Sequence, residues 1–114
     1  MRTLFITLVL SLLPIISYSN TNGGIVGETV IASGETTVLS AYPYDLSYKY
    51  VWEFDMDADK LDRQYSYTIT GNTITITHLG KSQSSLLDVY CTIYDNAGAI
   101  IGFYDAEVVV QPRL

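Results

Sequence analysis

The sequence is poor in cysteine, histidine and basic residues. Its 114 residues include one cysteine, one histidine and six Lys or Arg, against twelve Asp or Glu. One cysteine cannot form an intramolecular disulfide, so the fold has to rest on packing, without the ~2–5 kcal/mol that a native bridge typically supplies. The formal net charge of −6 and the lack of a basic stripe argue against nucleic acid as a partner.

Signatures of catalysis are also missing. The chain has neither a glycine-rich phosphate loop nor a nucleophile elbow, and His78 has no nucleophile at a recognisable spacing. A single imidazole without other placed ligands is a poor metal site. We therefore expect no enzymatic activity and no cofactor.

Long apolar runs are confined to the first residues of the chain. Residues 4–16 are almost wholly apolar, follow Arg2, and precede the small residues Ser17 and Ser19. The run is shorter than the roughly 20 residues that a membrane-spanning helix needs, and the pattern is typical of a signal peptide. We predict cleavage after Ser19, with an uncleaved anchor as the alternative. The mature chain would lose Arg2, carry a net charge of −7, and be secreted without membrane insertion, or exported to the periplasm or cell surface in a bacterium.

The rest of the chain has the residue pattern of β-strands. Ile74 and Ile76 alternate with threonines over residues 73–79, and Tyr50 and Trp52 share one side of residues 50–54. Helical periodicity is absent. The sequence predicts an all-β, two-sheet antiparallel sandwich of about seven or eight strands. It would span residues 28–111, between a flexible N-terminal segment at 20–27 and a tail at 112–114.

The alternation also predicts the core. Cys91 shares a face with apolar neighbours, which favours a buried thiol over a reactive one or an intermolecular bridge. The predicted core residues are Leu39, Ala41, Trp52, Phe54, Ile74, Ile76, Val89, Cys91 and Ile93.

These runs resemble an immunoglobulin-like domain of the intermediate set. Residues 34–41 resemble the B strand, with Ala41 at the place of the first cysteine, and Trp52 resembles the core tryptophan of strand C. Cys91 stands where the second cysteine is found, and residues 95–98 match the turn that follows. Ala41 removes the inter-sheet disulfide of that family, and Val89 replaces the tyrosine of its tyrosine corner. The resemblance implies a recognition domain.

A second resemblance is to PKD-like modules of secreted bacterial proteins. Trp52-Glu53-Phe54 is similar to their Trp-x-Phe signature, and residues 95–98 are similar to their Asp-x-x-Gly signature. Such modules need no disulfide. This resemblance implies a structural module that assembles through sheet edges, at residues 28–32 or 106–110, or that adheres to cell surfaces or carbohydrate.

The chain is rich in tyrosine, with ten in all. In a sandwich of this kind, the loops at 43–49, 70–72 and 95–98 converge at one end. Tyrosine at such an end supplies rigid contact area, although it also simply favours strands. We predict a monomeric, secreted recognition or adhesion module that binds a protein or cell-surface ligand. Its predicted contact residues are Tyr42, Tyr44, Asp45, Tyr48, Asp95 and Asn96.

One acidic stretch resembles the start of a calcium-binding EF-hand loop. Asp55, Asp57 and Asp59 alternate as its first ligands do, but Lys60 stands where the loop needs glycine and Ser66 where it needs glutamate. We predict a solvated acidic loop and no metal, with these three aspartates as the one weak calcium candidate.

Overall fold

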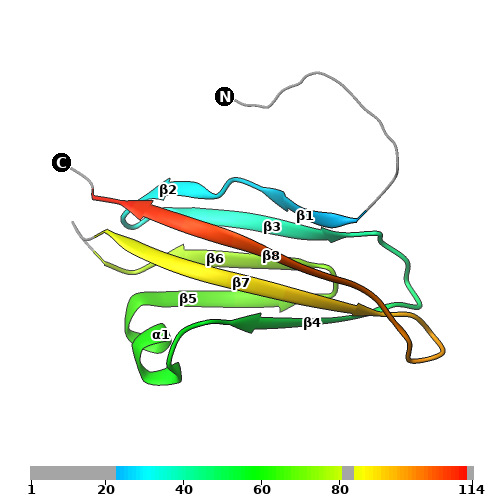
Figure 1. Cartoon of the computed structure of the whole chain (residues 1–114). Helices are drawn as coiled ribbons and strands as arrows, with labels where there is room; N and C mark the ends of the chain where they lie inside the picture. The colour runs from blue at the N-terminus through cyan, green and yellow to red at the C-terminus, as the bar shows by residue number, and fades with distance from the viewer. Residues whose placement is uncertain (1–22, 81–83, 113–114) are drawn as a thin grey trace, which may run out of the picture.

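The computed structural model describes residues 23–80 and 84–112, and these form two four-stranded sheets packed on one another (Figure 1). The prediction of an all-β sandwich is confirmed at this level. The signal peptide predicted at residues 1–19 lies outside the described residues. Within the described part of the chain, no helix has the length and apolar character needed to cross a membrane.

The first sheet is antiparallel throughout. Its strands lie in the order β1-β3-β6-β5, which are Gly24–Gly27, Thr36–Tyr42, Thr73–His78 and Tyr65–Thr70. Residues 24–27 had been predicted as part of a flexible segment, because glycine is unfavourable in strands. Instead they pair with β3, and the tertiary ladder overrides the weak local preference.

The second sheet contains one parallel pair. Its order is β2-β8-β7-β4, which are Val30–Ala32, Ile100–Gln111, Ser85–Tyr94 and Lys49–Phe54. β2 runs parallel to the end of β8, and the other pairs are antiparallel. The expectation of a purely antiparallel sandwich is therefore wrong at β2.

A short helix, α1 at Ala58–Gln64, occupies the stretch predicted to be a charged loop. It begins after Asp57 in the N-cap position and buries Leu61 against the core, while its other residues are mostly exposed. Two helical turns with a single buried residue show no apolar repeat in the sequence, which is why periodicity could not reveal this helix.

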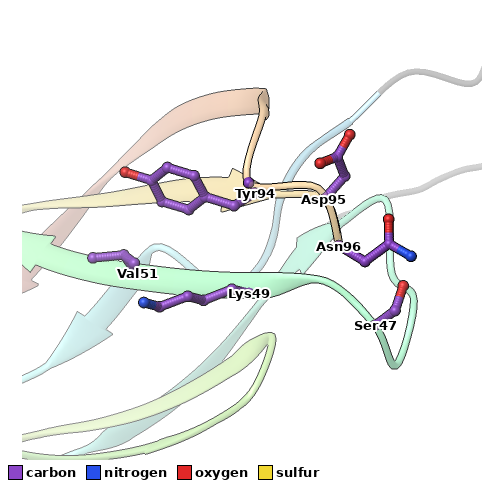
Figure 2. A pocket seen from close by; sticks show the side chains of 7 residues that line it. Ser47, Lys49, Val51, Tyr94, Asp95 and Asn96 are labelled. Carbon is purple, nitrogen blue, oxygen red and sulfur yellow. The ribbon is translucent and has the colours of Figure 1, made fainter.

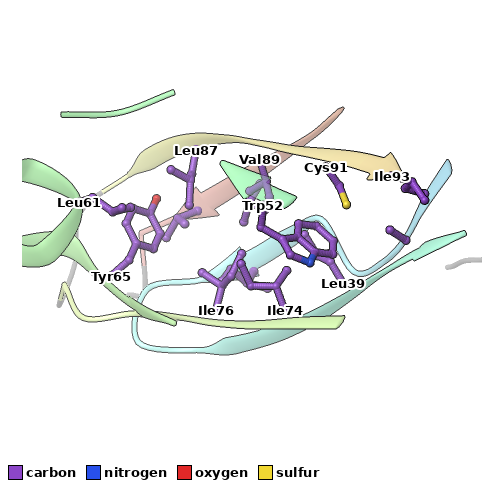
Figure 3. Close-up of a cluster of buried hydrophobic side chains, with 14 residues drawn as sticks. Leu39, Trp52, Leu61, Tyr65, Ile74, Ile76, Leu87, Val89, Cys91 and Ile93 are labelled. Atoms are coloured by element: carbon purple, nitrogen blue, oxygen red, sulfur yellow. The ribbon is translucent and has the colours of Figure 1, made fainter. Parts of the chain in front are cut away.

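The core lies between the two sheets and is built from their inward-facing residues (Figure 3). Every predicted core residue is buried except Phe54, which is partly buried and packs on Tyr67 with ring centroids 4.7 Å apart. Trp52 lies in register with Cys91, and its indole Nε1–H donates to the backbone oxygen of Gly71 at 3.1 Å. Burial raises the pKa of the Cys91 thiol to about 11, so the thiol is neutral near pH 7.

The outer face of the first sheet is a neutral hydroxyl surface. Cross-strand rows of Ser and Thr run over β5, β6 and β3, for example Thr70, Thr73 and Ser40. No outward residue of these three strands is charged. This face contrasts with the outer face of the second sheet, which carries most of the charge on the strands.

His78, at the end of β6, is a buried polar residue. It is 1% exposed, and neither ring nitrogen has a hydrogen-bond partner among the residues that the structure describes. The imidazole lies edge-on to the Tyr65 ring, with centroids 5.1 Å apart. Burial lowers the pKa of His78 because the charged form would lose its hydration.

We predict that His78 makes the fold less stable in mild acid. The unfolded chain takes up a proton near pH 6.5, whereas the folded imidazole takes it up only at lower pH. The stability is therefore complete above the unfolded pKa and is lost as the pH falls below it, by at most about 1.4 kcal/mol per pH unit. Urea unfolding at about pH 7.5 and about pH 5.5 measures this loss. His78→Phe should reduce it, and an equal loss in both proteins would contradict the assignment.

Candidate functional site

Three loops meet at one end of the sandwich, as the sequence predicted (Figure 1). Lys49, which begins β4, pairs with Tyr94, which ends β7, so the loops at 43–48 and 95–99 lie side by side. The turn between β5 and β6 is fixed to the end of β3, which leads into the loop at 43–48. The Ala41 N–H donates to the Asn72 backbone oxygen at 2.8 Å, and the Asn72 Nδ2 donates to the Ala41 oxygen at 3.0 Å. We call the loops at 43–48, 71–72 and 95–99 the loop end.

The loop at 43–48 is held by a tyrosine of the neighbouring strand. The Tyr50 hydroxyl donates to the Pro43 oxygen at 2.9 Å and accepts from the Asp45 N–H at 3.1 Å. Tyr44 stacks over the Tyr50 ring, with centroids 6.4 Å apart and planes at 13°. Burial is the main cause that raises the pKa of Tyr50, so its hydroxyl stays protonated and can donate. The sequence predicts Tyr50 only as part of a strand.

The two aspartates among the predicted contact residues shape their own loops. Asp45 Oδ1 accepts from the backbone N–H and the hydroxyl of Ser47, at 2.9 and 2.8 Å, and these bonds lower the pKa of Asp45. Asp95 Oδ1 accepts from the N–H groups of Ala97 and Ala99, both at 2.9 Å. Each carboxylate therefore orders a turn, a role that the sequence alone had not distinguished from ligand contact.

Tyr44 and Leu46 of the loop end are 52% and 90% exposed, and Tyr42, which ends β3 and directly precedes the loop at 43–48, is 44% exposed. Leu46 was not among the predicted contact residues, because a single leucine in a loop carries no pattern. Tyr48 was, but it is partly buried and packs against the core. The three exposed side chains are the ones that a partner can cover.

A hollow of about 420 Å³ lies between β4 and the β7–β8 hairpin, and Ser47 of the loop at 43–48 lines it (Figure 2). Asp95 and Asn96 line it, as does Lys49, the only basic residue at this end within the described ranges. The other lining residues were not predicted and come from the paired strand ends and the hairpin: Ser47, Val51, Tyr94 and Gly98. The site thus combines an apolar rim with a small polar hollow.

The aspartates of the calcium candidate lie away from the loop end. Asp57 is the N-cap residue of α1, Asp59 lies in its first turn, and Asp55 follows β4. Over residues 23–80 and 84–112, no three His, Cys, Asp or Glu side chains are grouped so that they could hold a metal ion.

Comparisons with known proteins add no assignment. No protein-family model matches the chain, and no curated protein matches it.

We predict that Tyr50→Phe loosens the loop at 43–48. The substitution removes the hydroxyl that joins Pro43 and Asp45, and should lower the free energy of unfolding by about 0.5–1.5 kcal/mol. Tyr44→Phe is the matched control, since Tyr44 is 52% exposed and its hydroxyl makes no hydrogen bond to a described residue. Urea unfolding of both variants provides the measurement. Equal stabilities for the two would show that the Tyr50 hydroxyl does not hold the loop.

Proposed function

We propose that this chain is a secreted, single-domain, immunoglobulin-like recognition module that binds a protein or cell-surface ligand through its loop end, without catalysis. The observation that carries the proposal is the loop end itself. Three loops are ordered by internal hydrogen bonds, Tyr42, Tyr44 and Leu46 are exposed, and residues of two of these loops line a hollow. Recognition in sandwich proteins commonly uses such loops on a rigid scaffold.

The strand arrangement supports the immunoglobulin-like assignment. When β1 and β3 to β8 are lettered A to G along the chain, the spatial order β1-β3-β6-β5 corresponds to the A-B-E-D sheet of that fold. The order β8-β7-β4 corresponds to its G-F-C sheet. β2 adds a short parallel strand beside β8. The PKD-like alternative is also a sandwich, so the strand order supports the sandwich architecture more strongly than it supports one of the two families.

The order within the loops supports binding in particular. A loop that is already fixed loses little conformational entropy when a partner covers it. The contacts of Tyr50 and Asp95 fix two of the three loops before any partner arrives. Tyr44 adds a rigid ring, stacked in place, which is the kind of side chain that paratopes use.

A second candidate is edge-to-edge assembly, and one edge favours it. The two edges that the sequence predicts for assembly, at 28–32 and 106–110, partly cover each other, because Val30–Ala32 pairs with residues 109–111. β4 carries Lys49 and Glu53, and charges of this kind discourage pairing with another sheet. β5, however, is an uncharged edge strand of the first sheet, and its Tyr67 and Ile69 are about two-fifths exposed. It therefore offers a more open edge than β4 does.

We predict that Tyr44→Ala folds normally and weakens binding. Fluorescently labelled protein would be screened against arrays of purified extracellular proteins and glycans. For any ligand found, Tyr44→Ala should cost more than about 1 kcal/mol, roughly a five-fold rise in Kd. Thr68→Ala, on the hydroxyl face of the first sheet, is the control and should leave Kd unchanged. A ligand that is indifferent to Tyr44→Ala, Leu46→Ala and Asn96→Ala would contradict binding through the loop end.

Light scattering separates the two candidates. A recognition module should keep the mass of a monomer as its concentration is raised. Growth of the mass with concentration, abolished by Ile69→Lys on β5, would instead establish edge assembly.

A further inference from the structure

The outer face of the second sheet carries exposed side chains on β4 and β8, whereas Thr92 on the central strand β7 is buried between its neighbours. Its outward side chains form cross-strand rows, because the registers of β4, β7 and β8 are fixed. One row contains Val51, Thr92 and Phe103, and the next contains Glu53, Tyr90 and Asp105. A third row pairs Asp88 with Glu107, and the Asp55 N–H donates to the Asp88 backbone oxygen at 3.0 Å. We call this surface the acidic–aromatic face.

Negative charge on this face outnumbers positive charge, because Lys49, at the start of β4, is its one basic residue within the described ranges. Five carboxylates gather there, and none forms an ion pair with a described residue: Glu53, Asp55, Asp88, Asp105 and Glu107. Asp88 stands directly opposite Glu107, an arrangement that destabilises a strand pair. Lys60 and Arg63 lie on α1, which contacts β5 of the other sheet. A cationic partner would relieve this repulsion.

The charge surrounds an aromatic pair. The rings of Tyr90 and Phe103 stack with centroids 5.9 Å apart and planes at 9°. Phe103 is 61% exposed, and Ile101, two residues earlier on the same face of β8, is 38% exposed. Burial is the main cause that raises the pKa of Tyr90, and the negative charges of Asp88, Asp55 and Asp105 raise it further. Tyr90 therefore lies close enough to these three carboxylates to interact with their charge. An exposed flat ring beside carboxylates offers a cation both a π-face and an anion.

We propose that the acidic–aromatic face docks an arginine-bearing segment of a partner protein. A guanidinium can lie flat on the Phe103 ring while its N–H groups reach the Asp105 carboxylate, since residues 103 and 105 are alternate residues on the same side of β8. A lysine ammonium pairs with carboxylates but lacks the flat stacking surface. The face adjoins the hollow at Val51, but its carboxylates and its aromatic pair belong to neither the hollow nor the loop end, so the inference goes beyond the proposed function.

Charge also decides against three other occupants. A second copy of the chain, placed face to face, would bring five carboxylates against five, and like charges juxtaposed across an interface oppose association. Nucleic acid and anionic membrane surfaces would be repelled in the same way. A basic protein segment is the occupant that both the carboxylates and the rings fit.

The test uses hexa-arginine and hexalysine peptides with the mature protein. Isothermal titration at low and at physiological salt should give tighter binding of hexa-arginine, with an affinity that falls as salt rises. Asp88→Asn combined with Asp105→Asn should raise Kd at least about ten-fold for both peptides, because two of the five carboxylates are neutralised. Phe103→Ala should raise Kd for hexa-arginine several-fold and leave that for hexalysine nearly unchanged.

Asp59→Asn combined with Asp62→Asn is the matched control. It makes the same change in net charge on the exposed surface of α1, and should alter Kd less than about two-fold. Equal weakening by the two double variants, or an unchanged preference for arginine in Phe103→Ala, would overturn the proposal and leave only attraction by net charge. Tyr44→Ala should leave peptide binding intact, and circular dichroism confirms that each variant is folded.

Discussion

The structure depends on how Trp52 joins the two sheets. Its indole is 7% exposed, lies in register with Cys91 in the second sheet, and donates to Gly71 in the turn of the first sheet. Residue 41 is a fully buried alanine and residue 91 is a fully buried free thiol, so no disulfide joins the sheets at this point. Packing around the tryptophan has to supply the cohesion that a bridge would give, and truncating such a side chain typically costs about 3–5 kcal/mol.

The same strand positions the loop end. Trp52 fixes the turn at 71–72, whose Asn72 in turn pairs with Ala41 at the end of β3. Two residues before Trp52, the inward-facing Tyr50 fixes the loop at 43–48. The loops are therefore ordered from the core outwards, while the two outer faces of the sandwich are left free to differ. One is neutral and rich in hydroxyls, and the other is acidic and aromatic.

Much of the fold could be predicted from the sequence, because a half-buried strand imposes a period of two. Ile74 and Ile76 face the core and the threonines between them face outwards, as the alternation indicated. The helix α1 could not be predicted, since its only buried residue is Leu61. At the loop end, composition indicated where the loops meet but not which side chains order them, because that depends on backbone geometry. The acidic–aromatic face could not be predicted without the strand register, because only the pairing of β7 with β8 places Asp88 opposite Glu107.

Hydrogen exchange at the Trp52 indole N–H tests the central claim most directly. Two-dimensional NMR of the ¹⁵N-labelled protein in D₂O follows this one proton without altering the molecule. If the indole joins the sheets through the Gly71 oxygen, its N–H should exchange as slowly as the backbone amide of Cys91, its buried cross-strand neighbour. Exchange at the rate of a free indole, while the Cys91 amide remains protected, would contradict the account.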